Sequence, residues 1–135
     1  MSSIYQGRSI CPGLAEGQAL VTKQGVSFLG GVDPETGVIT EVDHELHGRS
    51  VAGQVLVLPS LKGSAGGMWI IIRLARSGLG PKAIVVSKAD TILVGAVIMS
   101  EIPTIDSLAE DPLKLLATGD RIRIDGEKGT LEILD

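Results

Sequence analysis

The fold is decided by residues 55–86, which read VLVLPSLKGSAGGMWIIIRLARSGLGPKAIVV. Residues 55–59 are an apolar run that ends in proline, a pattern typical of a buried strand. Residues 68–77 alternate apolar and basic side chains at helical spacing, and Gly78 and Pro81 mark the end of this helix. Residues 83–86 are again continuously apolar, as parallel strands are. The stretch therefore predicts a right-handed β-α-β unit.

A glycine-rich loop joins the predicted strand to the predicted helix: Lys62, Gly63, Ser64, Ala65, Gly66 and Gly67. It places the Ser64 hydroxyl at a helix start, where free backbone N–H groups and the helix dipole favour negative charge. Ser64 is thus a candidate for binding an anion or for activation toward its alkoxide. The alternative is that Ser64 only caps the helix and that the glycines only form a tight turn.

The rest of the chain predicts one α/β domain with a mixed sheet over residues 1–135. Residues 17–22, 26–29 and 38–42 are predicted strands, and a glycine-rich loop at 30–37 is either a close-contact surface or a wide hairpin. Asp90 is expected to cap a helix at 91–100, followed by an extended piece at 102–106 and a helical turn near 111–116. Residues 120–125 and 130–134 alternate polar and apolar side chains, as the two strands of a hairpin do.

Composition excludes several classes of function. The net charge of −4 and three aromatic residues disfavour nucleic-acid binding. One cysteine and two histidines cannot assemble a zinc or iron–sulfur ligand set, and Cys11 is expected to be a small buried hydrophobe. No apolar run is long enough to span a bilayer and the start lacks a signal-peptide pattern, so we expect a cytoplasmic protein. At 135 residues the chain is short for an enzyme with its own cofactor site, which suggests a partner.

Five motifs in order resemble one family: FLGGVDPETG at 28–37, Asp43-His44 with Gly48, the strand at 55–59, Lys62-Gly63-Ser64, and PKAI at 81–84. Together they resemble the small subunit, or swivel domain, of the aconitase X family. The resemblance implies a swivelling β/β/α domain that closes over a large subunit, which supplies an iron–sulfur cluster and most of the substrate pocket.

The resemblance also implies a hydro-lyase. Archaeal-type members dehydrate mevalonate 5-phosphate, whereas bacterial relatives include cis-3-hydroxyproline dehydratases. Residues 100–106, SEIPTID, look more like the phosphomevalonate branch. Ser100-Glu101 departs from the usual Ala-Gly of that branch, and Ala65-Gly66-Gly67 replaces the further Ser or Thr residues common in both.

In this family the serine at the position of Ser64 is regarded as the catalytic base. Lys62 is then a candidate for a substrate carboxylate or phosphate, with a solvated lysine as the alternative, and Gly63, Ala65, Gly66 and Gly67 are candidates for backbone contacts. The expected partner surface holds Gly30, Gly31, Asp33 and His44, although Asp33 is also suited to hold its own turn and His44 to be plainly exposed. Trp69 is expected to pack in the core or, as the alternative, to shape the pocket, and Arg73 and Arg76 are expected on a solvated face or at a subunit contact.

Two other functions fit the pattern less well. A phosphohistidine carrier domain has a similar C-terminal end, but it needs a histidine at the glycine-rich helix start, where this chain has Ser64. A non-catalytic assembly module with the same fold is the second alternative.

Overall fold

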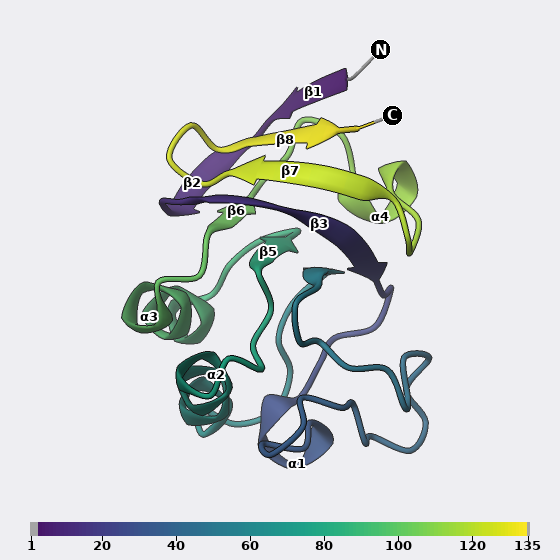
Figure 1. Ribbon diagram of the computed structural model, residues 1–135, viewed down its shortest axis with the longest axis vertical. Helices are drawn as coiled ribbons and strands as arrows, with labels where there is room; N and C mark the ends of the chain where they lie inside the picture. Colours follow the sequence, from purple (N-terminus) through teal and green to yellow (C-terminus); the bar gives the residue numbers. More distant parts are fainter. Residues whose placement is uncertain (1–2, 135) are drawn as a thin grey trace.

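The computed structural model describes residues 3–134, which form two β layers and a helical layer (Figure 1). The elements in chain order are β1 (Ser3–Gln6), β2 (Arg8–Cys11), β3 (Leu14–Val21), α1 (Phe28–Gly31), β4 (Val55–Leu58), α2 (Gly67–Arg76), β5 (Ala83–Val86), α3 (Thr91–Ser100), β6 (Thr104–Asp106), α4 (Pro112–Leu115), β7 (Arg121–Asp125) and β8 (Thr130–Ile133). The predicted mixed α/β fold of the β/β/α type is confirmed.

The eight strands form one sheet in the order β1-β8-β7-β3-β4-β5-β6-β2. The segment from β3 to β6 is parallel and the other pairings are antiparallel. The two outermost strands, β1 and β2, are separated only by Gly7, so the sheet bends back on itself. A Cβ at Gly7 would lie 2.6 Å from the carbonyl oxygen of Asp106, so this corner excludes a side chain.

Alternation along β4 divides the interior into two cores. Val55 and Val57 point into a core enclosed by the bent sheet, together with Ile105, Ile122 and others. Leu56 and Leu58 point to the opposite side, where they meet the buried faces of α2 and α3 and the loop between α1 and β4. Because both faces of β4 are covered, all four of its residues are buried, as expected of a strand within a parallel sheet.

The structure confirms the predictions that rest on long local patterns. β4, α2 and β5 form the β-α-β unit, with β4 and β5 parallel and in register from Val55 with Ala83. The predicted helix at 91–100 is α3, and its N-cap Asp90 accepts a hydrogen bond from the N–H of Leu93 at 2.8 Å. The predicted C-terminal hairpin is β7 and β8.

Two predictions about the first half were wrong, and two strands were missed. Residues 26–29 do not form a strand: only Val26 bridges to Leu61, and residues 28–31 form the helical turn α1, which packs against α2. Residues 38–42 contribute only isolated bridges, at Val38 and Ile39. The strands β1 and β2 were not predicted at all.

Candidate functional site

The loop from β4 to α2 leaves Ser64 exposed at the carboxyl end of the parallel strands, where ligands bind in many open α/β sheets. The alternative that Ser64 caps α2 through its side chain does not hold. The N-cap is Gly66, which provides no side chain, and only the backbone carbonyl of Ser64 contributes, accepting from the N–H of Gly67 at 3.1 Å. Within the described residues, the Ser64 hydroxyl has no hydrogen-bond partner.

Backbone donors accompany this hydroxyl. Within residues 3–134, the N–H groups of Gly63, Ser64, Ala65 and Gly66 donate no hydrogen bond. The N–H of Gly67 is engaged with Ser64, so of the predicted backbone contacts Gly67 is not available as a donor in this conformation. Free N–H groups ahead of a ten-residue helix make a region where negative charge is stabilised.

A cavity of about 430 Å³ opens beside this loop. Its lining residues come from three segments that are separate in sequence: Ser27, Leu29, Gly30, Gly31, Glu41, Lys62 and Gly63. The structure therefore brings the predicted partner-loop residues Gly30 and Gly31 together with Lys62 and Gly63.

Gly63 shows how closely these segments approach. Its φ is +93°, and a Cβ at this position would lie 2.6 Å from the hydroxyl oxygen of Ser27. A side chain would be strained by the backbone and would also clash with Ser27. Glycine is therefore required for the loop that carries Ser64 to lie against the α1 segment.

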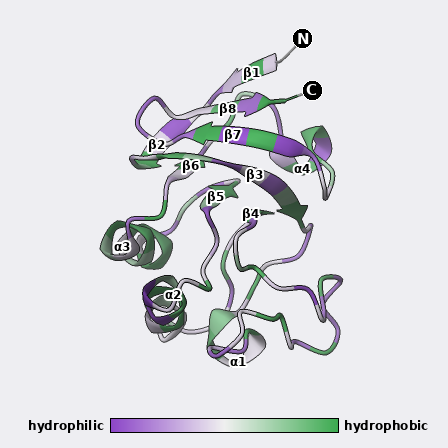
Figure 2. Ribbon diagram, in the orientation of Figure 1, coloured by the Kyte–Doolittle hydropathy of each residue, from purple (hydrophilic) through white to green (hydrophobic). Residues whose placement is uncertain are grey.

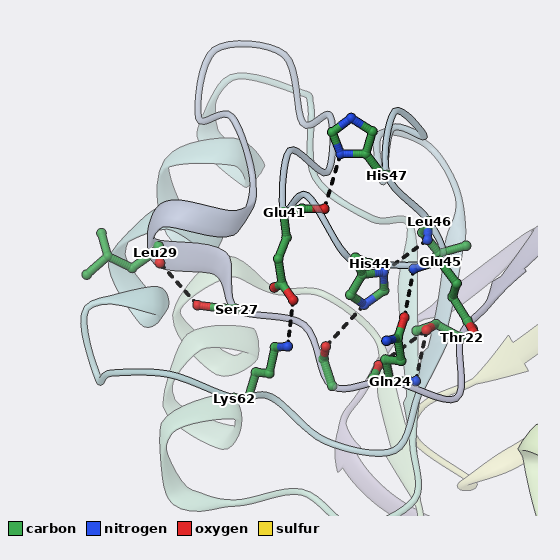
Figure 3. Close-up of polar contacts among 11 residues, drawn as sticks. Thr22, Gln24, Ser27, Leu29, Glu41, His44, Glu45, Leu46, His47 and Lys62 are labelled. Atoms are coloured by element: carbon green, nitrogen blue, oxygen red, sulfur yellow. Dashed lines mark hydrogen bonds and ion pairs between the residues drawn. The ribbon is translucent and has the colours of Figure 1, made fainter.

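Lys62 is neither free nor simply solvated. Its Nζ donates to Oε2 of Glu41, which also lines the cavity, at 2.5 Å (Figure 3), and the two side chains are 47% and 25% exposed. Sequence reasoning missed both Glu41 and Ser27. Glu41 lies 21 residues before Lys62 in an irregular loop, so no periodic pattern links the two.

His44 supports the loop that carries Glu41 and is not exposed. Its side chain is 4% exposed, contrary to prediction, because its ring lies inside the loop. Nδ1 accepts from the N–H of Leu46 at 3.0 Å, which leaves Nε2 to donate to the carbonyl oxygen of Gly25 at 3.1 Å (Figure 3). The ring is thereby defined as the neutral Nε2–H tautomer, and it is not available as a side-chain contact for a partner.

Asp33 holds its own turn, as one of its two predictions stated. Its Oδ1 accepts from the N–H of Glu35 at 2.9 Å, and the side chain does not line the cavity. The prediction that Trp69 packs in the core was wrong. Trp69 is 59% exposed on α2, on the same face as the exposed residues Arg73 and Arg76.

The described residues do not fit a metal cluster. No group of three or more His, Cys, Asp or Glu side chains that could hold a metal ion occurs among them. Cys11 is buried, and burial together with the charge of Glu101 raises the pKa of its thiol. A thiol held protonated is a poor iron ligand.

Over residues 3–134, no helix has both the length and the apolar character needed to cross a membrane.

Comparison with known proteins gives a consistent result. The sequence profile described as the aconitase X swivel domain matches residues 4–133. The phosphomevalonate dehydratase small subunit of Thermococcus kodakarensis is 43% identical over 130 residues, which cover 96% of each chain. That of Archaeoglobus fulgidus is 43% identical over 128 residues, covering 95% of this chain and 96% of the relative. A crystal structure of Thermococcus kodakaraensis aconitase X in its holo form matches with a TM-score of 0.93 at 41% identity, covering 98% of this chain and 99% of that one.

Proposed function

This chain belongs to the aconitase X swivel-domain family, and we propose that it is the small subunit of a phosphomevalonate dehydratase. The names of its relatives support this, since they cover nearly the whole chain at 43% identity. The observation that carries the proposal is the exposed Ser64 hydroxyl in a loop with free backbone N–H groups, beside a cavity that holds Lys62.

In the proposed reaction, mevalonate 5-phosphate loses water between the carbon next to its carboxylate and the carbon that bears its hydroxyl. Ser64 Oγ takes the proton from the first carbon, the C–H electron pair forms the new double bond, and the hydroxyl departs from the second carbon. The product is an anhydromevalonate phosphate. A serine acts as a base only where its alkoxide is stabilised, and the N–H groups of Ala65 and Gly66 with the start of α2 supply that stabilisation.

Lys62 and the free N–H of Gly63 are proposed to bind the anionic end of the substrate. The substrate carries a carboxylate and a phosphate, and both match a lysine and backbone donors. Glu41 holds Lys62 in place while the site is empty of substrate, and an incoming anion competes with Glu41 for the ammonium group.

The remaining parts of the active site are proposed for a large subunit. The described residues of this chain do not fit an iron–sulfur cluster, so we assign the cluster and the groups that take the departing hydroxyl to that partner. The segment with Gly30 and Gly31 lines the cavity and is proposed to face it. Closure of a small domain over a large one would exclude water from the Ser64 loop.

The experiment is reconstitution with the large subunit from the same genome, under anaerobic conditions. We expect the complex, but neither subunit alone, to dehydrate mevalonate 5-phosphate, with the product identified by mass spectrometry as substrate minus water. Turnover of cis-3-hydroxyproline instead would assign the chain to the other branch. An assembled complex that turns over neither substrate would indicate a non-catalytic swivel module.

A further inference from the structure

We propose that the exposed face of α2, formed by Trp69, Arg73 and Arg76 and continued by Leu29, is the surface by which this chain docks on its large subunit. We call it the α2 docking face. Its complement on the partner is an apolar recess for the indole, bordered by carboxylates. The inference rests on the proposed function for the identity of the partner.

The three α2 residues lie on one side of the helix. Positions 69, 73 and 76 are four and three residues apart, which brings them onto one stripe at 100° per residue. All three are exposed, whereas Ile71 and Leu74, on the opposite side, are completely buried against the sheet. The helix is therefore fully anchored by one face, and the domain does not use the other.

Trp69 is unusual for its exposure. A tryptophan carries a large apolar surface that is favourable to bury, yet this one, the sole tryptophan of the chain, is 59% exposed. Leu29, 49% exposed, lies near the start of α2, since a Cβ on Gly66 would be only 2.6 Å from Leu29 Cδ2. Two large apolar side chains are thus exposed to solvent on adjoining segments.

The charge of this face is opposite to that of the chain. The protein has 16 acidic and 12 basic residues, but α2 contains no acidic residue. Among residues 3–134, Arg49, Arg73 and Arg76 form no ion pair, whereas Arg8, Arg121 and Arg123 are paired with carboxylates. Favourable interaction with the helix dipole explains basic residues near the end of α2. It does not explain an exposed tryptophan one turn earlier.

The combination of an exposed tryptophan with two arginines that form no ion pair indicates a partner with an apolar recess and acidic residues around it. Trp and Arg are the residues most enriched among those that dominate binding energy at protein interfaces, and a basic stripe selects an acidic counterpart. The neighbouring helix α3 differs: its exposed apolar residues Ile98 and Met99 lie on a helix that contains no charged residue. Figure 2 shows this contrast, since α2 carries strongly hydrophilic segments while α3 is hydrophobic to neutral along its length.

Position supports the same occupant. The stripe begins five residues after Ser64, and Leu29 lines the cavity that holds Lys62. A subunit seated on this face would border the Ser64 loop and the cavity together. The α2 docking face is therefore placed to bring the large subunit's part of the active site against this one.

The first test measures docking directly. The chain is labelled with 5-fluorotryptophan, which reports on Trp69 alone, and unlabelled large subunit is added. We expect the fluorine resonance of Trp69 to shift and broaden on assembly. Stable complex formation with an unshifted resonance would overturn the proposal. If the unmodified chain forms no complex at all, the large-subunit assignment in the proposed function fails and the docking inference fails with it.

The second test measures affinity in the same reconstitution. Trp69→Ala should raise the Kd by about 30-fold or more, as for a central interface tryptophan, with Trp69→Phe intermediate. The matched control is Ile98→Ala on α3, which should leave the Kd unchanged. Equal effects of the two alanine variants, or none from Trp69→Ala, would contradict the proposal. Turnover at saturating large subunit should be retained in Trp69→Ala.

The third test concerns charge. Arg73→Gln with Arg76→Gln should weaken association by about 10-fold and reduce its dependence on salt. The control, Lys114→Gln with Lys128→Gln, removes the same charge from exposed positions on α4 and the β7–β8 turn. Equal weakening by both pairs would mean that only net charge matters, and would refute a specific acidic counterpart. Self-association of the chain through Trp69, seen as a concentration-dependent resonance shift without partner, would assign the face to a second copy instead.

Discussion

The helices α2 and α3 begin in the same setting, but their N-termini are capped differently. Each follows a buried parallel strand, β4 before α2 and β5 before α3. At α3, Asp90 caps the helix through its carboxylate, and Asp106 accepts from the N–H of Ala89 just before it, at 2.8 Å. At α2, the N-cap is Gly66, no side chain caps the helix, and the preceding N–H groups are free within the described residues.

The difference separates a helix start that stabilises the fold from one that is available to a ligand. An uncapped start leaves unsatisfied donors and forgoes roughly 1 kcal/mol of stability. The α2 loop accepts this cost at the place where Ser64, Lys62 and the cavity meet. At the start of α3, the carboxylates of Asp90 and of Asp106 on β6 satisfy the same kind of donors.

The largest expected effect is that of Ser64→Ala in the reconstituted complex. Because Ser64 is proposed as the base, turnover should fall by about 10²–10⁴-fold, the range for a positioned proton-transfer group. The Ser64 side chain caps nothing in this structure, so the melting temperature and the Kd for the large subunit should stay the same. Rate measurements, thermal melts and a binding titration with the large subunit would measure the three quantities.

Turnover within a few-fold of wild type, with assembly intact, would remove Ser64 from the catalytic role. A substantial loss of stability would mean that its hydroxyl caps α2 after all. The two outcomes are separable because the rate and the melting temperature are measured on one preparation.

Gly63→Ala should have the next largest effect, through the conformation of the loop. The positive φ and the approach of Ser27 Oγ are expected to cost about 2–4 kcal/mol of folding stability together. Urea denaturation would measure this. Gly63→Ala combined with Ser27→Ala should recover part of the loss, because it removes the atom in closest conflict. No recovery would show that the backbone strain alone is responsible.

The sequence predicted the elements whose signal is local. The β-α-β unit and α3 were found because apolar runs, helical spacing and end signals are all contained within residues 55–86 and 90–100. The strands β1 and β2 carry little such signal, since each has only four residues and half of the eight side chains are exposed and polar. They form because they pair with strands about 100 to 130 residues away, as Ser3 does with Ile133 and Arg8 with Asp106.

The same difference between local and long-range signals applies to the residues of the site. The loop around Ser64 was predicted because its glycines, serine and flanking elements are contiguous. Glu41 was missed because its contact with Lys62 depends on how a long irregular loop folds back. His44 was misplaced for a related reason: a polar residue in a loop suggests exposure, but here both ring nitrogens find backbone partners.

Asp106→Asn tests the start of α3, where carboxylates of the protein itself accept from the free N–H groups. Asp106 is completely buried and accepts from Arg8 at 2.9 and 2.7 Å as well as from Ala89. Burial alone would raise the pKa of Asp106, but the hydrogen bonds from Arg8 and Ala89 outweigh it and the pKa is lowered. The variant should lose about 2–3 kcal/mol at neutral pH, since its amide NH₂ cannot accept from all three donors.

The pH dependence of this loss has a definite sign. A carboxylate whose folded-state pKa is lowered stabilises the protein above its unfolded pKa of about 4, and this contribution disappears as the pH falls through the folded-state value. The stability difference between wild type and Asp106→Asn should therefore be full above about pH 5 and shrink below pH 4. A difference that is constant from pH 7 to pH 3 would mean that folding does not shift the pKa of Asp106.

The smallest expected effect, that of Asp90→Ala, completes the comparison. Removing the carboxylate that caps α3 should cost about 1 kcal/mol of folding stability, the usual value for a lost N-cap. In the reconstituted complex its turnover should match wild type, because the α3 start takes no part in the proposed chemistry. Thermal melts and steady-state rates measured beside Ser64→Ala would then give opposite patterns: stability lost with activity kept at α3, and activity lost with stability kept at α2. If Asp90→Ala lowered turnover as strongly as Ser64→Ala, the two helix starts would not be divided between structure and function in the way that their capping indicates.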